Sequence, residues 1–134
     1  SVDAWAAEAR LANLRPAIAL DAAAPDWPIV SADALLCVNM LHISPWDAAV
    51  GLFAGAGRVL GSGAPLVLYG PFVEPDVETA ASNHAFDQSL RQRDPAWGLR
   101  STADLDRLAA GHGMTRTARC AMPANNLVLV YRRD

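Results

Sequence analysis

The chain has 134 residues, of which 52% are hydrophobic and 19% charged, and its net charge is −3 with no lysine at all. This composition predicts one folded domain over residues 1–134 and argues against disorder and against a chain-wide basic surface for nucleic acid. The missing lysine excludes Schiff-base and P-loop lysine chemistry, and no apolar run approaches the roughly 20 residues that span a bilayer.

The first third of the chain predicts a helix and two short strands. Residues 2–13 keep a helical spacing of apolar side chains, and residues 17–21 form a short apolar segment that predicts a strand. A loop follows over residues 22–28. The apolar run over residues 32–40 is short and bounded by loop residues, which favours a buried strand over a helix.

The clearest helix start in the sequence follows this second strand. Ser44 can cap the helix and Asp47 takes the third position, which resembles a capping box with Asp in place of Glu. Gly61 and Gly63 supply the stop, before another buried strand over residues 65–69. The predicted apolar face consists of Trp46, Ala49, Val50, Phe53, Gly57 and Leu60.

Two further helices precede the end of the chain. The first is predicted over residues 83–93 with Ser82 as its cap, and the second begins at Ser101 and ends at Gly111. Asn83, Asp87 and Arg91 are spaced four apart and share one helix face. They predict either a surface pair between Asp87 and Arg91 or a helix that roofs a ligand crevice.

The order of the elements predicts the fold class. Residues 114–122 and 127–131 predict a terminal antiparallel hairpin, while the earlier apolar strands alternate with amphipathic helices. This pattern is typical of an α/β fold with a mostly parallel sheet. Ligands of such sheets bind beyond the carboxyl ends of the strands, so polar residues that directly follow a strand are candidate site residues.

Three polar side chains occupy such positions. Asn39 and His42 follow the strand over residues 32–40, and His42 can serve as a general base near neutral pH. The alternative is that His42 satisfies a loop backbone and Asn39 shapes a turn. Asp21 ends an earlier strand, where it can accept a hydrogen bond from a ligand or cap its own loop.

Other chemistries lack their motifs in this sequence. The three histidines have no ligand at metal-motif spacing, and there is no nucleophile elbow or glycine-rich nucleotide loop. Cys37 and Cys120 lie in apolar segments, which favours two buried thiols in a cytoplasmic protein over a disulfide.

Longer segments resemble known methyltransferases. Residues 33–63, ending in Arg58-Val59-Leu60-Gly61-Ser62-Gly63, resemble the middle of a class I S-adenosylmethionine-dependent methyltransferase. Over nearly its whole length the chain is similar to the methyltransferase-like 26 family, also called domain of unknown function 938. The segments that carry this resemblance are Asn39–Trp46, Leu68–Phe72, Ser82–Asn83, Phe86–Asp87, Leu90–Arg91, Trp97–Arg100 and Met122–Leu127.

The resemblance implies a Rossmann-like sheet, S-adenosylmethionine as cofactor and a small molecule as methyl acceptor. It implies that Asp21 and Ala22 lie near the adenine, that Asn39 and Met40 lie near the methionine end, and that His42 is the catalytic base. The residues implied on the substrate side are Trp46, Tyr69, Phe72, Asn83, Asp87 and Arg91.

The chain also departs from this family. Its relatives begin earlier, with a strand and a glycine-rich turn that hold the cofactor, so we expect a partial domain that lacks the first strands. This favours a fragment of an enzyme, or alternatively a non-catalytic binding or assembly module with the same fold. Residues 17–21 are then expected to lack a partner strand. We also expect the exposed sheet edge at residues 32–38 to be covered, either by a second copy of the chain or by the N-terminal helix.

Overall fold

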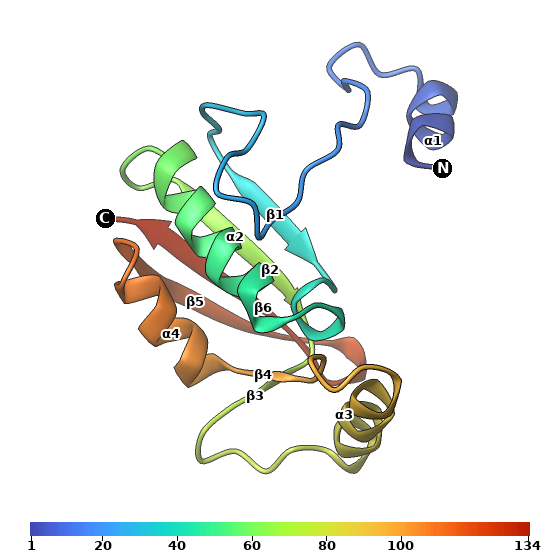
Figure 1. The fold of residues 1–134 in the computed structure, drawn as a ribbon, viewed down its shortest axis with the longest axis vertical. Coiled ribbons are helices and arrows are strands. Elements are labelled where there is room, and N and C mark those ends of the chain that lie inside the picture. Colours follow the sequence, from blue (N-terminus) through green and yellow to red (C-terminus); the bar gives the residue numbers. More distant parts are fainter.

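A four-stranded mixed sheet forms the centre of the computed structural model, which describes residues 1–134 (Figure 1). The strands lie in the order β1-β2-β6-β5. β1 and β2 are parallel, and β6 pairs antiparallel with both β2 and β5, so that β6 alone opposes the other three. This confirms the α/β fold, the mostly parallel sheet and the antiparallel terminal hairpin. The strands are β1 (Leu35–Val38), β2 (Pro65–Gly70), β5 (Met114–Met122) and β6 (Asn126–Arg133).

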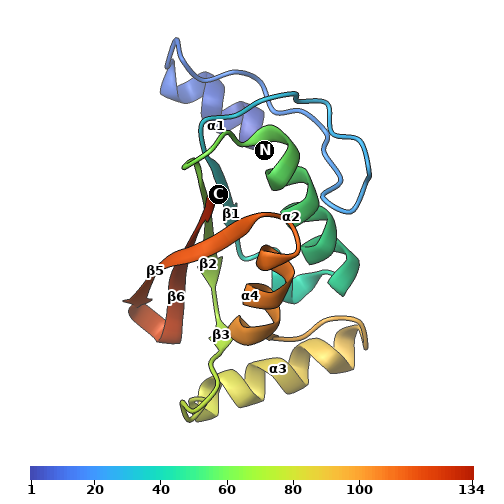
Figure 2. The ribbon, with the colours of Figure 1, turned by 90° about the vertical axis from the view of Figure 1, so that its left-hand side faces the viewer.

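Helices cover one face and one end of this sheet. α2 and α4 pack on the same face, whereas α3 lies across the end of the sheet to which β1 and β2 point (Figure 2). Two single turns, η1 and η2, and a small parallel pair of strands, β3 and β4, complete this end. These elements are α2 (Trp46–Val59), α3 (Ala81–Arg93), α4 (Thr102–Ala110), η1 (Leu41–Ile43), η2 (Pro123–Asn125), β3 (Phe72–Val73) and β4 (Arg100–Ser101).

The core lies between the sheet and the helices α2 and α4. Phe53 of α2 and Tyr131 of β6 are completely buried and meet edge to face, with ring centroids 5.1 Å apart. Leu66, Leu68 and Leu129 alternate with half-buried residues along their strands, as expected when one face of a sheet is covered. The alternation places Gly70 at the carboxyl end of β2 on the buried face.

The structure corrects two of the predicted helix starts. α2 begins after Pro45, and the Ser44 hydroxyl donates to the carbonyl of Met40 at 2.9 Å instead of capping the helix. α3 begins at Ala81, so Ser82 lies inside its first turn. The Ser82 hydroxyl accepts a hydrogen bond from the side chain of Asn125 at 3.3 Å, so neither hydroxyl caps its helix. The predicted cap of α4 is confirmed, because the Ser101 hydroxyl accepts from the amide of Ala103.

The N-terminal predictions are only partly confirmed. α1 (Val2–Ala9) forms, but residues 17–21 are exposed and not a strand, since no neighbouring strand supplies the hydrogen-bond ladder. α1 projects away from the sheet and leaves the edge strand β1 uncovered, with Leu36 70% exposed (Figure 1). The prediction that the N-terminal helix covers this edge is therefore wrong, and the pairing of this edge with a second copy of the chain stays a prediction.

Both cysteines are free thiols. Cys37 on β1 is half-buried, and burial raises the pKa of its thiol to about 11. Cys120 is exposed, which corrects the prediction that it is buried, because it lies on the outer strand β5. Two strands separate the cysteines, a distance of roughly 14 Å at the usual strand spacing and too far for a disulfide. None of the helices has the length and apolar character needed to cross a membrane.

Candidate functional site

A cleft of about 520 Å³ opens at the carboxyl ends of β1 and β2. It brings together four of the predicted site residues, namely Asn39, His42, Tyr69 and Asn83, from four different elements or turns. The strand-end rule therefore located the cleft correctly. The other lining residues are Ile43, Pro71, Ser82, Phe86, Ala124, Asn125 and Asn126.

His42 is the buried titratable group of this cleft. It lies on the single turn η1 and is 7% exposed, and its ring meets that of Phe86 edge to face with centroids 5.5 Å apart. Neither ring nitrogen has a hydrogen-bond partner in the chain. Every fully buried side-chain nitrogen and oxygen of the protein does have a partner, so the two ring nitrogens are not fully buried. Each ring nitrogen of His42 therefore keeps some contact with solvent, and His42 is one of the residues that line the cleft.

The surroundings of His42 keep its imidazole uncharged. Burial lowers its pKa below the usual 6.5, and the positive charge of Arg100 lowers it further. At neutral pH the ring is therefore neutral and able to accept a proton. A neutral imidazole with an unoccupied nitrogen is the form that a general base requires.

This lowered pKa predicts a pH dependence of stability. Below about pH 6.5 the unfolded chain binds a proton at His42 that the folded chain resists, so the free energy of unfolding falls as the pH falls toward the folded pKa. Urea titrations between pH 7.5 and roughly 5 measure this slope. The His42→Gln variant is expected to lose most of it, whereas replacement of the exposed His84 retains it; equal slopes in both variants contradict the prediction.

The backbone that carries His42 is fixed by a distant segment. The guanidinium of Arg100 donates to the carbonyls of Leu41 at 3.0 Å, Ser44 at 2.7 Å and Ala96 at 2.9 Å. The amide of Gly98 donates to the carbonyl of His42 itself at 3.1 Å. The backbone of the turn η1 is therefore held from outside, and with it the position from which the His42 side chain projects.

Asp87 and Arg91 do not line the cleft but support the segment that holds His42. Asp87 accepts hydrogen bonds from the amide of Leu99 at 2.8 Å and from Arg91 at 3.0 Å. The surface pair predicted from their spacing is therefore present. The alternative prediction was a helix that covers a ligand crevice. The first turns of α3 do cover the cleft, with Asn83 and Phe86 facing it.

Asn39 has a conformation that few other residues adopt. Its φ is 53°, in the left-handed region that asparagine tolerates better than most side chains. Its side chain lies beside Gly70, since Asn39 Oδ1 and His42 Nδ1 would each be in ordinary contact, at 3.6 Å, with a Cβ added there. Both polar groups therefore converge on the end of β2.

The remaining predicted site residues lie outside this cleft. Asp21 accepts from the amide of Ala23, and Ala22 packs so closely on α2 that a Cβ on Gly51 would lie 2.1 Å from its carbonyl oxygen. Met40 is half-buried against the core. Trp46 lies beneath the guanidinium of Arg100 at 5.7 Å, and Phe72 is a buried core residue.

Sequence reasoning missed the contribution of Phe86 and of the β5–β6 turn to the cleft. Asn125 and Asn126 precede a strand, so a search for polar residues after strands does not find them. Their only signal was their place in the segment Met122–Leu127, which carries part of the family resemblance. β6 runs against β1 and β2, and its start therefore lies where they end.

Comparison with known proteins gives a family and a fold. A family model described as "Protein of unknown function (DUF938)" matches residues 1–133. The crystal structure of mitomycin 7-O-methyltransferase MmcR is similar over 78% of this chain and 30% of its own, with TM-score 0.68 and 20% identity. The SAH-bound form of CalO1, a methyltransferase in calicheamicin biosynthesis, is similar over 79% of this chain and 31% of its own, with TM-score 0.66 and 16% identity. LepI in complex with SAM is similar over 97% of this chain and 33% of its own, with TM-score 0.73 and 17% identity.

These likenesses show the fold alone, because identity is 20% or lower in each. The chain spans about a third of the length of each of these three structures.

Proposed function

The chain belongs to this family of unknown function, DUF938, and we propose that it forms the acceptor side of the active site in an S-adenosylmethionine-dependent methyltransferase acting on a small molecule. The observation that carries the proposal is the cleft in which a buried, neutral His42 presents two unoccupied ring nitrogens. The methyltransferases of similar fold support it. The quoted segments favour the methyltransferase-like 26 subgroup, and the free thiols favour the cytoplasm.

The cleft fits the reactive end of the cofactor together with a small acceptor. Its volume of about 520 Å³ lies in the range of roughly 300–1,000 Å³ that small-molecule sites occupy. The carboxamide of Asn39 is exposed at its wall and suits the polar methionine end. Asp21 and Ala22 do not line the cleft, so the described residues do not build an adenine pocket there.

The residues of the cleft have separate tasks in the proposed reaction. S-adenosylmethionine, when bound, supplies a methyl group on a sulfonium. His42 takes the proton from the hydroxyl of the acceptor at an unprotonated ring nitrogen, which makes that oxygen a stronger nucleophile. Phe86 and Tyr69 narrow the space around the reacting atoms and exclude water. Arg100 and Gly98 keep His42 in position.

A non-catalytic binding or assembly module is the second reading of the same cleft. A fold of this kind does not by itself fix an activity, and the module would bind a small molecule without transferring a methyl group. A second copy of the chain on the open edge of β1 is the partner that we propose, because Leu36 and Val38 are exposed there.

Calorimetric titration of S-adenosylmethionine into the full-length protein tests the proposed function. We expect saturable binding that weakens about tenfold in the Asn39→Gly variant, since glycine keeps the left-handed backbone but removes one or two hydrogen bonds. Arg10→Gly is the matched control, because Arg10 has a φ of 50° on the remote helix α1. Absence of binding by the folded protein overturns the proposal, and binding without methyl transfer to any hydroxyl acceptor supports the non-catalytic module.

A further inference from the structure

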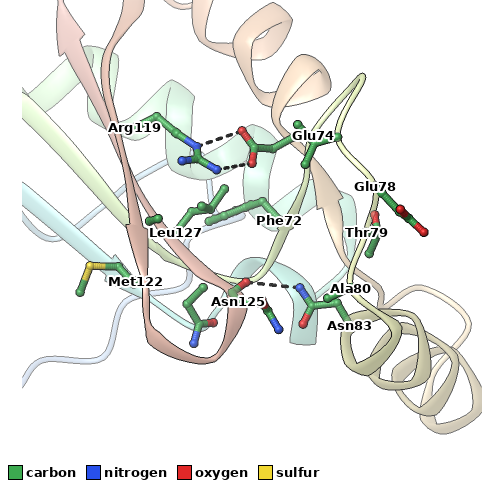
Figure 3. A pocket seen from close by; sticks show the side chains of 13 residues that line it. Phe72, Glu74, Glu78, Thr79, Ala80, Asn83, Arg119, Met122, Asn125 and Leu127 are labelled. Carbon is green, nitrogen blue, oxygen red and sulfur yellow. Dashed lines mark hydrogen bonds and ion pairs between the residues drawn. The ribbon is translucent and has the colours of Figure 1, made fainter.

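A second cavity of about 200 Å³ lies beside the cleft, between the segment that joins β3 to α3 and the β5–β6 hairpin (Figure 3). Two links across this gap enclose it. At one end Arg119 forms a two-point ion pair with Glu74, with nitrogen–oxygen distances of 2.6 and 3.1 Å. At the other end Asn83 donates to the carbonyl of Asn125 at 3.3 Å.

The link between Asn83 and Asn125 is also the wall between the cavity and the cleft. Asn83, Asn125 and Asn126 line both spaces. At 3.3 Å the hydrogen bond is longer than the usual 2.9–3.0 Å, and so is the one from Asn125 to the hydroxyl of Ser82. The partition between the two spaces is therefore thin and weakly held.

The turn that forms this partition has a strained backbone. Ala124 and Asn125 have φ values of 60° and 58°, and the left-handed region is unfavourable for alanine, which has no polar side chain to compensate. Such strain persists where the surrounding structure imposes it, and it is enriched at ligand sites. Its position between two cavities is consistent with a turn shaped by what binds there.

The lining of the cavity suits an uncharged group. Phe72 and Leu127 are buried at its base, and Ala121 and Met122 lie along the hairpin side. The charges of Glu74 and Arg119 satisfy each other. Glu78 also lines the cavity and forms no ion pair, but its carboxylate is directed away from Phe72 and Leu127 (Figure 3). Asn83 Oδ1 accepts no hydrogen bond from the chain. Because every fully buried polar side-chain atom has a partner, Asn83 Oδ1 is not fully buried and can accept a hydrogen bond from a ligand.

We infer that this cavity is the specificity subsite for the far end of the methyl acceptor. The acceptor is then a neutral, extended molecule whose reactive hydroxyl lies at His42 and whose apolar tail passes Asn83 and Asn125 into the cavity. The inference rests on the proposed function for the direction in which the acceptor lies. It adds the class of acceptor and the residues that select its length.

Leucine methyl NMR tests the subsite without any need for methyl transfer. Leu127 lines the cavity beside Phe72, whereas Leu129 is buried in the core and does not line it (Figure 3). With 4-butylphenol as probe we expect the Leu127 signals to shift and the Leu129 signals to stay. Phenol lacks the tail and is expected to leave Leu127 unshifted and to bind about tenfold more weakly, as burial of about two methylene groups predicts.

Two alanines of β5 provide a matched pair of variants. Ala121→Phe fills the cavity and is expected to abolish the preference for 4-butylphenol, whereas Ala118→Phe places the same side chain on an exposed position of the strand outside it. Unshifted Leu127 signals, equal affinities for the two phenols, or an unchanged preference in Ala121→Phe overturns the inference. A Leu127 shift in a protein that transfers no methyl group supports the subsite and overturns the proposed activity instead.

Discussion

The His42→Ala variant is expected to lower kcat for methyl transfer to a hydroxyl acceptor by about 10²–10⁴-fold, the usual contribution of a general base. His42 is the buried, neutral group that lines the cleft with its ring nitrogens free of hydrogen bonds to the chain, and alanine offers no atom to take the acceptor's proton. KM is expected to change little, because the proton moves only as the reaction proceeds. Transfer of a labelled methyl group to a phenol, measured across the neutral pH range, gives both constants.

The pH profile separates a base from a merely structural histidine. In the wild-type protein activity is expected to fall on the acidic side as His42 takes up a proton, at a pH below the usual histidine range. In the variant this acidic decline disappears. The matched control is His84→Ala, since His84 is exposed on α3 and does not line the cleft. A variant with an unchanged pH profile removes His42 as the base.

The Arg100→Met variant is expected to lower the free energy of unfolding by about 2–4 kcal/mol. Methionine replaces most of the apolar stem, but the carbonyls of Leu41, Ser44 and Ala96 all lose a charged donor. The carbonyls of Leu41 and Ser44 are partly buried, in and beside the turn that carries His42, and such acceptors are costly to leave without partners, whereas the exposed carbonyl of Ala96 can bind water. Urea unfolding monitored by circular dichroism measures the change.

Arg93→Met is the control for this variant. Arg93 lies over the ring of Trp97 at 5.5 Å, much as Arg100 lies over Trp46 at 5.7 Å, but it is exposed. The comparison therefore isolates the three hydrogen bonds from the cation–π contact, and Arg93→Met is expected to cost at most about 1 kcal/mol. Loss of the positive charge at Arg100 also raises the pKa of His42, so the acidic decline of activity moves to higher pH. Equal losses of stability in both variants contradict the role assigned to Arg100.

The site was predictable where a local rule applies. Asn39 and His42 directly follow an apolar strand, and the rule that ligands bind at strand ends placed both in the cleft. The family resemblance implied that Asp87 and Arg91 lie on the substrate side, and their spacing puts them on one helix face with Asn83. Spacing along a helix gives the face but not what lies opposite, and the structure places the amide of Leu99 there.

The sequence by itself determined the four helices and the four strands of the main sheet in their order, the α/β class, the terminal hairpin and the chemistry that a chain without lysine cannot perform. These follow from periodicity and composition, which each segment carries alone. Only the tertiary structure decided which segments pair and what is buried. Residues 17–21 have apolar side chains but no neighbouring strand, and the contact from Arg100 to Leu41 joins residues 59 positions apart. Such contacts arise from packing between distant segments, so no local pattern records that His42 is buried, uncharged and held from across the chain.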